Sequence, residues 1–206
     1  MHTTNSILNE ILTITPFPGW SLDALHPYVA DQLSRLEFDL LFPSGTESLI
    51  SEYHNHLRLL LNESIKMMPH DLGITAKIRW AMQAHFEHII QFASAERAAI
   101  NELYRPNLII QAPVYVGQLT DIMWRAAGDD STDMNYYTKR GTLGVIYIAT
   151  LVYWHTSNAP IDEVMQFFDE RLNNLISITT HVKTYTPSRD NIMKNVKLLK
   201  SIFWDR

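Results

Sequence analysis

Residues 121–140 read DIMWRAAGDDSTDMNYYTKR, and they place aromatic side chains, carboxylates and a closing Lys-Arg pair around one break between two helices. Gly128 predicts the end of the first helix, because glycine readily adopts the left-handed conformation that closes a helix. Asp130 or Ser131 can cap the second helix, and Asp133 then lies in its first turn, where the helix dipole favours a carboxylate. Capping does not explain the aromatic and basic residues of this stretch, so we expect it to carry function.

Helical spacing of apolar residues recurs along the whole chain, and strand patterns are nearly absent. Proline and glycine breaks separate the predicted helices, with a connector bracketed by Pro106 and Pro113. The predicted helices span residues 6–14, 22–33, 36–41, 47–68, 74–92, 95–104, 119–127, 132–154, 161–181 and 190–204. We therefore expect an all-α fold with about nine body helices and a C-terminal amphipathic helix.

Composition excludes several classes of protein. The chain has 206 residues, of which 46% are hydrophobic, enough for one core or for a small domain joined to a larger one. It contains no cysteine, which excludes disulfides, thiolate nucleophiles and cysteine metal sites. The first twelve residues have no basic region, so we expect no signal or transit peptide. The longest apolar stretch, residues 141–154, is shorter than the roughly 20 residues of a membrane span.

No set of residues has the pattern of a catalytic or metal site. His85 and His88 could form a ligand pair on one helix, but no second pair accompanies them. His85 also shares an apolar stripe with its helix neighbours, so we interpret it as a buried or pocket-facing histidine. A hard cation could bind carboxylates of the 121–140 stretch, but capping and a partner-facing surface explain them better. We expect neither an enzyme nor a bound metal or cofactor.

The pattern D-x-M-W-x-x-A-G-D-x-S-T-D-x-N-x-Y-T-K-R resembles the signature of the Coq-nine family of ubiquinone-biosynthesis accessory proteins. Looser similarity lies at Pro18-Gly19-Trp20, at Phe42-Pro43 with Gly45, and over residues 147–154. The resemblance implies a TetR-like helical protein that binds an isoprenoid quinone intermediate or a phospholipid and is not an enzyme. It also implies that the protein assists the di-iron demethoxyubiquinone hydroxylase, forms a homodimer and works at a membrane face. In a bacterium that face is the cytoplasmic face of the inner membrane, and in a eukaryote it is the matrix side of the mitochondrial inner membrane.

This resemblance divides the chain into three parts. Residues 1–45 correspond to a degenerate helix-turn-helix-like subdomain, residues 46–185 to a helical lipid-binding domain, and residues 186–206 to a membrane-associating tail. The alternative is a TetR-type transcriptional regulator that senses an apolar ligand. Its recognition segment would be residues 35–41, RLEFDLL, with one basic and two acidic residues. Because DNA binding needs several Lys or Arg contacts to phosphates, we expect no nucleic-acid partner.

The helix predicted over residues 132–154 is apolar almost all round from Gly141 onward, as in a helix surrounded by others. Such a helix either fills a core or lines a cavity, and the pattern alone does not separate the two. The resemblance favours a cavity. The predicted lipid-binding residues are Met82, Phe86, Ile89, Met123, Trp124, Tyr137, Leu143, Tyr147 and Leu151. The predicted partner-docking residues are Asp121, Met123, Trp124, Asp129, Asp133, Tyr136, Lys139 and Arg140.

The C-terminal helix, residues 190–204, has the pattern of a helix that lies on a membrane surface. Its apolar residues share one face, its lysines lie opposite or on the flank, and an aromatic residue stands near its end. Fifteen residues reach only about 22 Å as a helix, which is too short to span a bilayer. The alternative is a capping helix packed on the body. The predicted membrane-contacting residues are Ile192, Lys194, Val196, Lys197, Leu199, Lys200, Phe203 and Trp204.

Overall fold

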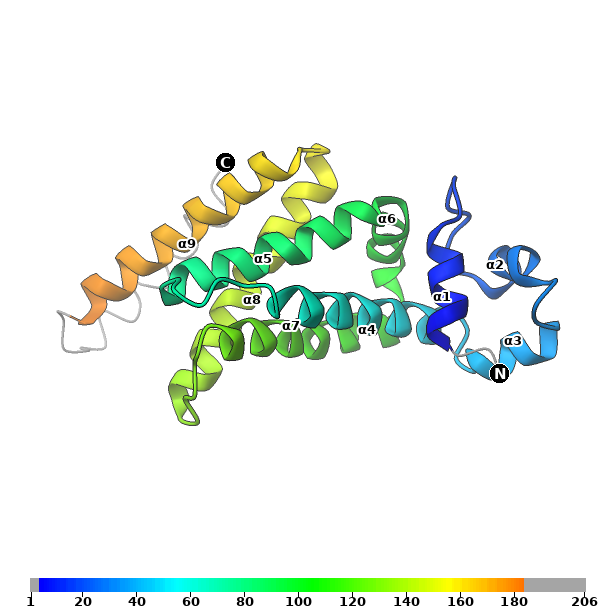
Figure 1. Cartoon of the computed structure of the whole chain (residues 1–206), viewed down its shortest axis with the longest axis horizontal. Helices are drawn as coiled ribbons and strands as arrows, with labels where there is room; N and C mark the ends of the chain where they lie inside the picture. The colour runs from blue at the N-terminus through cyan, green and yellow to red at the C-terminus, as the bar shows by residue number, and fades with distance from the viewer. Residues whose placement is uncertain (1–3, 184–206) are drawn as a thin grey trace. The chain divides into compact units, whose positions relative to one another are not determined.

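The structure, a computed structural model, describes the backbone of residues 4–183 and the side chains of residues 4–174. Over this range every regular element is helical, which confirms the predicted all-α fold (Figure 1). The elements are α1 (Thr4–Leu12), α2 (Leu22–Val29), α3 (Arg35–Leu41), α4 (Thr46–Ile65), α5 (Ile74–Gln91), α6 (Ala93–Asn101), η1 (Glu102–Tyr104), α7 (Pro106–Ala126), α8 (Met134–Ser157) and α9 (Ile161–Lys183).

The chain divides into two compact units, Met1–Phe168 and Asp169–Arg206, and the division falls within α9. The predicted tail helix, with all eight of its proposed membrane contacts, lies outside the described residues. No helix in the described range is both long and apolar enough to cross a membrane.

The three short N-terminal helices are held by caps and by a small apolar core. Ser21 caps α2 by accepting from the Ala24 N–H at 3.1 Å, and Ser34 caps α3 through a reciprocal capping box with Glu37. The indole of Trp20 is 1% exposed and donates to the Ala95 carbonyl of α6 at 2.8 Å. This bond ties the N-terminal segment to the rest of the unit.

The body of the unit is built from four longer helices, α4, α5, α7 and α8. Figure 1 shows α4 lying beside α5 and α7, and α7 and α8 also pack closely on each other. On α4 the buried residues recur at helical spacing, from Leu49 and Tyr53 to Leu57 and Leu61. On α5 the predicted apolar stripe that contains His85 is buried as well. The core therefore follows the periodicity of the sequence.

Helix α7 differs from the prediction, because the expected connector after Pro106 is helical. Pro106 stands in the first turn of α7, where a missing N–H leaves no hydrogen bond unmade. Pro113 lies inside the helix and removes one backbone hydrogen bond. Leu108 and Leu119 are nonetheless buried on α7, and this packing outweighs the loss of one bond. The result is one helix of 21 residues that forms a wall of the site described next.

Candidate functional site

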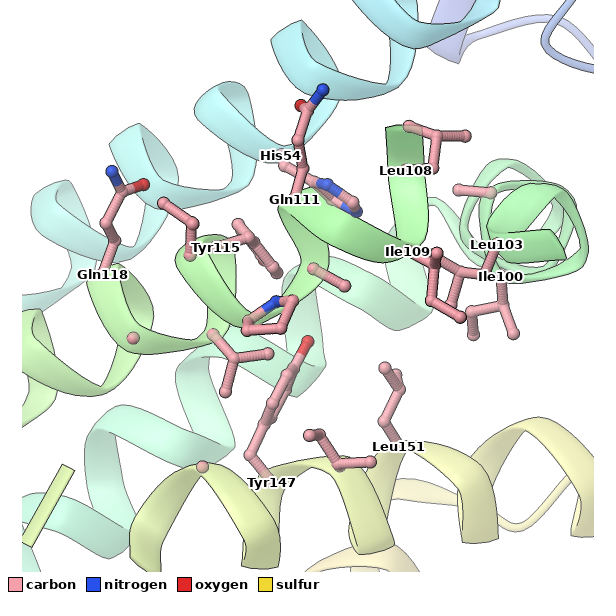
Figure 2. Close-up of a pocket in the computed structure, with 18 of the residues that line it drawn as sticks. His54, Ile100, Leu103, Leu108, Ile109, Gln111, Tyr115, Gln118, Tyr147 and Leu151 are labelled. Carbon is pink, nitrogen blue, oxygen red and sulfur yellow. The ribbon is translucent and has the colours of Figure 1, made fainter. Parts of the chain in front are cut away.

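A cavity of about 930 Å³ lies between α4, α6, η1, α7 and α8. This volume lies in the range of natural small-molecule sites. Aliphatic side chains from three of these elements gather at one end of it, as Figure 2 shows for Ile100, Leu103, Leu108 and Ile109. Leu151 of α8 lies across from them. The lining is mostly apolar, which suits a hydrophobic ligand.

The edge of the cavity carries aliphatic side chains that face solvent. We call them the apolar rim; they are 47–60% exposed. The rim consists of Ile109, Val114, Val145, Ile148 and Val152. It lies on two helix stretches, residues 106–120 and 141–157, that contain no Asp, Glu, Lys or Arg. Contiguous exposed apolar surface is uncommon in soluble proteins and marks a ligand or interaction site.

The cavity also has a polar part. His54 stacks on Tyr115 with 4.1 Å between ring centroids, and the Tyr147 hydroxyl lies 3.4 Å from Nε2 of His85. Burial, followed by the positive charge of Arg58, lowers the pKa of His54 to about 4. Burial also raises the pKa of the Glu96 carboxyl to about 7. His54 is therefore uncharged at neutral pH, and Glu96 is protonated in part.

Beside the cavity, the 121–140 stretch folds into an ion-pair network between the end of α7 and the start of α8. Arg140 donates to Asp121 at 2.7 Å and to Asp129 at 3.0 Å, and Lys139 also pairs with Asp129. The Tyr136 hydroxyl donates to Asp121 at 3.2 Å, and the Arg140 guanidinium lies 3.6 Å from the Tyr136 ring centroid. We call these five residues the joint network. They hold the two helix ends together.

Electrostatics in the joint network follow from this packing. The side chains of Arg140 and Asp129 are only 7% and 6% exposed. Hydrogen bonds from Lys139, and then from Ser131 and Arg140, hold the pKa of the Asp129 carboxyl well below its usual range. Asp129 is therefore ionised at any physiological pH, and its charge is matched inside the fold.

A family model for COQ9 matches residues 110–179, which run through most of α7, all of α8 and most of α9. The ubiquinone biosynthesis protein COQ9, mitochondrial, of Xenopus tropicalis is 26% identical over 205 residues, covering 92% of this chain. These matches support the COQ9 family for this chain. The human protein of the same name is 26% identical over 183 residues and covers 84% of the chain. This chain spans 63% and 57% of the length of these two relatives.

Three of the nine predicted lipid-binding residues line the cavity: Tyr137, Tyr147 and Leu151. Five others are buried in the helix core and do not line it: Met82, Phe86, Ile89, Met123 and Leu143. Trp124 is half-buried, and its indole donates to the Lys139 carbonyl at 3.1 Å. The α5 residues differ because α5 packs on α4 and α7, whereas the rim of the cavity follows α7 and α8. Lipid contact by any of the nine stays a prediction.

The apolar rim and Glu96 were missed from the sequence. The charge-free run of residues 106–120 was the available signal for the rim, but its prolines concealed the helix. Helix α8 is not surrounded on all sides as predicted, since Val145, Ile148 and Val152 face outward. Nothing in the spacing around Glu96 distinguishes it from an ordinary exposed glutamate.

The cap of α8 also differs from the prediction. Gly128 does end α7, with φ of 90° and a bond from the Asp129 N–H to the Trp124 carbonyl at 2.9 Å. The N-cap of α8, however, is Asp133, whose carboxylate accepts from the Asn135 N–H at 2.9 Å. Ser131 instead donates to Asp129. The loop is longer than expected because its first polar residues complete the joint network.

The eight predicted partner-docking residues have very different exposure. Asp133 is exposed, whereas Met123 is fully buried and Arg140 nearly so. Asp121, Asp129, Tyr136, Lys139 and Arg140 are engaged with one another. The exposed large hydrophobic side chains next to them are Met134 and Tyr137, at 77% and 68%. Partner binding by these eight residues stays a prediction, and the surface available for it centres on the first turn of α8.

The two histidines considered as ligands face different surroundings. His85 is fully buried against Tyr147, and His88 forms a 2.9 Å hydrogen bond with Ser64. In the described part of the chain, no group of three or more His, Cys, Asp or Glu side chains is arranged to hold a metal ion.

Proposed function

We propose that this protein is a lipid-binding accessory protein of ubiquinone biosynthesis that presents a quinone intermediate to the demethoxyubiquinone hydroxylase. The observation that carries the proposal is the apolar cavity of about 930 Å³ with its exposed apolar rim. The names of the COQ9 relatives supply the pathway. Exposing an isoprenoid chain to water costs about 0.8 kcal/mol for each CH₂, so such a cavity can shield the chain of a lipid that leaves the membrane.

The proposal places the protein at a membrane face, where the apolar rim would meet the lipid. It also retains the predicted homodimer. The relatives named above are mitochondrial by name. For this chain, the compartment and the dimer stay predictions.

Filling the cavity from two glycines is expected to abolish lipid binding without loss of stability. Gly117 of α7 and Gly141 of α8 both line the cavity, and a Cβ added at either meets nothing within 4 Å. The double variant Gly117→Leu, Gly141→Leu should reduce co-purified lipid at least tenfold, measured by mass spectrometry of solvent extracts. Its melting temperature should not fall, because replacing a glycine inside a helix stabilises by roughly 0.5–1 kcal/mol.

The matched control is Gly117→Ala, Gly141→Ala, which makes the same change in helix propensity but leaves the cavity open. It should retain lipid at the wild-type level. Gly144 is unsuitable, since a Cβ there would lie 2.9 Å from Cγ1 of Val116. If the leucine and alanine variants carry equal lipid, the lipid does not bind in this cavity.

We also propose that the hydroxylase docks on the first turn of α8. Interfaces concentrate their energy in a few large side chains ringed by polar groups, and Met134 projects there beside the joint network. Met134→Asp should weaken hydroxylase binding at least tenfold, roughly 1.4 kcal/mol. The measurement is a titration of the purified hydroxylase, with a melting curve for each variant.

Met67 offers the control, since it is 79% exposed against 77% for Met134 and lies between α4 and α5. Met67→Asp should bind the hydroxylase normally. For Asp133 the informative change is Asp133→Asn, because the asparagine side chain can still cap α8 while losing its charge. If Met134→Asp and Met67→Asp bind the hydroxylase with equal affinity, the hydroxylase does not dock on the first turn of α8.

A further inference from the structure

Helix α3 presents an apolar face to solvent in the N-terminal part of the chain. Leu36 and Leu40 are 70% and 71% exposed, and residues four apart lie on the same face of a helix. The opposite face is anchored by the fully buried Phe38, which contacts Phe42 with 5.2 Å between ring centroids. Figure 1 shows α2 and α3 at one end of the first unit. A short helix that is already held by one face therefore presents a second apolar face.

Carboxylates lie on both flanks of the two exposed leucines. An α-helix turns by about 100° per residue, which places Glu37 on one side of the leucine pair and Asp39 on the other. Asp23 of α2 lies on the Asp39 side, because Arg35 donates to Asp23 at 2.6 Å and to Asp39 at 2.8 Å. We call this surface the α3 face; it consists of Asp23, Leu36, Glu37, Asp39 and Leu40.

The charge of the N-terminal segment indicates which kind of partner fits the α3 face. Residues 1–45 contain five acidic residues and one basic residue, Arg35. That guanidinium is already held between two carboxylates, so it is not available to a phosphate group. A nucleic acid or an anionic membrane surface would meet like charge here, and so would the same face of a second copy. Only a positively charged partner is attracted to these carboxylates.

We propose that the α3 face docks a basic amphipathic helix of a partner protein, one whose apolar stripe is flanked by Lys or Arg. The apolar stripe packs on Leu36 and Leu40, as in other recognition of amphipathic helices. The flanking cations pair with Glu37 on one side and with Asp23 and Asp39 on the other, which fixes the orientation of the partner helix. None of these residues lines the cavity, and the proposal does not depend on lipid binding.

A designed peptide of roughly 18 residues, about five helical turns, tests the proposal. It has leucines along one helix face and lysines on both flanks, and a matched peptide carries glutamate in place of lysine. Fluorescence anisotropy of the labelled peptide with the purified full chain at low salt gives its dissociation constant. The wild type should bind the lysine peptide at least tenfold more tightly than the glutamate peptide.

Leu36→Ser, Leu40→Ser should weaken the lysine peptide at least tenfold, because the apolar contact is lost. The melting temperature should not change, since both side chains are largely exposed. The matched control is Leu59→Ser, Met67→Ser, which removes two exposed apolar side chains that do not line the cavity. It should bind the lysine peptide within twofold of the wild type.

The contribution of charge is tested with Glu37→Gln, Asp39→Asn. Glutamine at position 37 can still take part in the capping box of α3, so the helix is retained. This variant should weaken the lysine peptide about fivefold at low salt. At high salt its affinity should equal that of the wild type, because the screened ion pairs no longer contribute in either protein.

Equal binding of the lysine and glutamate peptides, or wild-type affinity of Leu36→Ser, Leu40→Ser for the lysine peptide, overturns the proposal. Other occupants of the α3 face give different results with the same leucine variant. Loss of self-association in analytical ultracentrifugation would assign the face to a second copy of the chain. Loss of flotation with vesicles of phosphatidylcholine and phosphatidylglycerol would assign it to a membrane. Either result also overturns a basic helix as the occupant.

Discussion

Replacing Arg140 with Leu is expected to lower the free energy of unfolding by about 3 kcal/mol or more. The guanidinium is 7% exposed and donates to Asp121 and Asp129 at 2.7 and 3.0 Å. Without it, the 6% exposed carboxylate of Asp129 loses one of its two cationic partners inside the fold. Removing one partner from a buried ion-pair network leaves carboxylate charge that is neither well solvated nor fully matched, and the native state carries that cost. Urea unfolding followed by circular dichroism measures the change.

Arg125 provides a control of the same residue type with a shared partner. It pairs with Asp121 at 2.7 Å, but its side chain is 67% exposed. Arg125→Leu should therefore cost less than about 1 kcal/mol, as exposed ion pairs do. Equal losses in the two variants would show that burial of the joint network does not determine its contribution. A hydroxylase-binding assay on Arg140 variants has to be read against this loss of stability.

The 121–140 stretch shows what spacing can and cannot predict. The helix break at Gly128 followed from local chemistry, because glycine adopts φ of 90° without strain. Whether the charged side chains face a partner or pair with one another did not follow from local chemistry. Asp121 and Arg140 are 19 residues apart, and they meet only because α7 and α8 pack on each other. A surface for a partner and an internal ion-pair network have the same composition, and only tertiary structure separates them.

The helices were predicted well where packing and local propensity agree. On α4, buried residues from Leu49 to Leu61 have the period that the sequence displays. The prediction failed over the first half of α7, where Pro113 argues against a helix. Local sequence patterns reflect the hydrogen bond that proline removes, but they do not reflect the burial of Leu108 and Leu119 on the same helix. Tertiary packing decided the outcome.

For a similar reason, the sequence did not decide whether α8 lines a cavity or fills a core. Leu143 and Leu151 are both apolar residues of α8, yet one is buried in the core and the other lines the cavity. A hydrophobic side chain has the same helical spacing in either place. Glu96 was invisible because a buried carboxyl has no sequence pattern of its own. Its position near Tyr53, Tyr115 and Tyr147 depends on how α4, α6, α7 and α8 come together around the cavity.

Glu96 gives the second large expected effect, a stability that depends on pH. Its pKa is about 7 in the folded protein against an ordinary value of 4.5, because burial disfavours the charged form. The folded state therefore holds this proton more tightly than the unfolded state. The resulting stability is fully present below pH 4.5 and is lost as the pH rises through 7. Complete loss amounts to about 3 kcal/mol.

The histidines act in the opposite sense over an overlapping range, so the change is measured as a difference between proteins. The pKa values of His54 and His85 are lowered to about 4 and about 3, and the stability they contribute is lost as the pH falls. Glu96→Gln keeps both histidines and removes only the carboxyl. From pH 8 to pH 4.5, the free energy of unfolding of the wild type should rise by about 3 kcal/mol relative to that of this variant. Glu87→Gln, at an exposed position on α5, should show no such gain. If the free energy of unfolding changes with pH in the same way in both variants and in the wild type, Glu96 is ionised in the folded protein and the polar part of the cavity is charged.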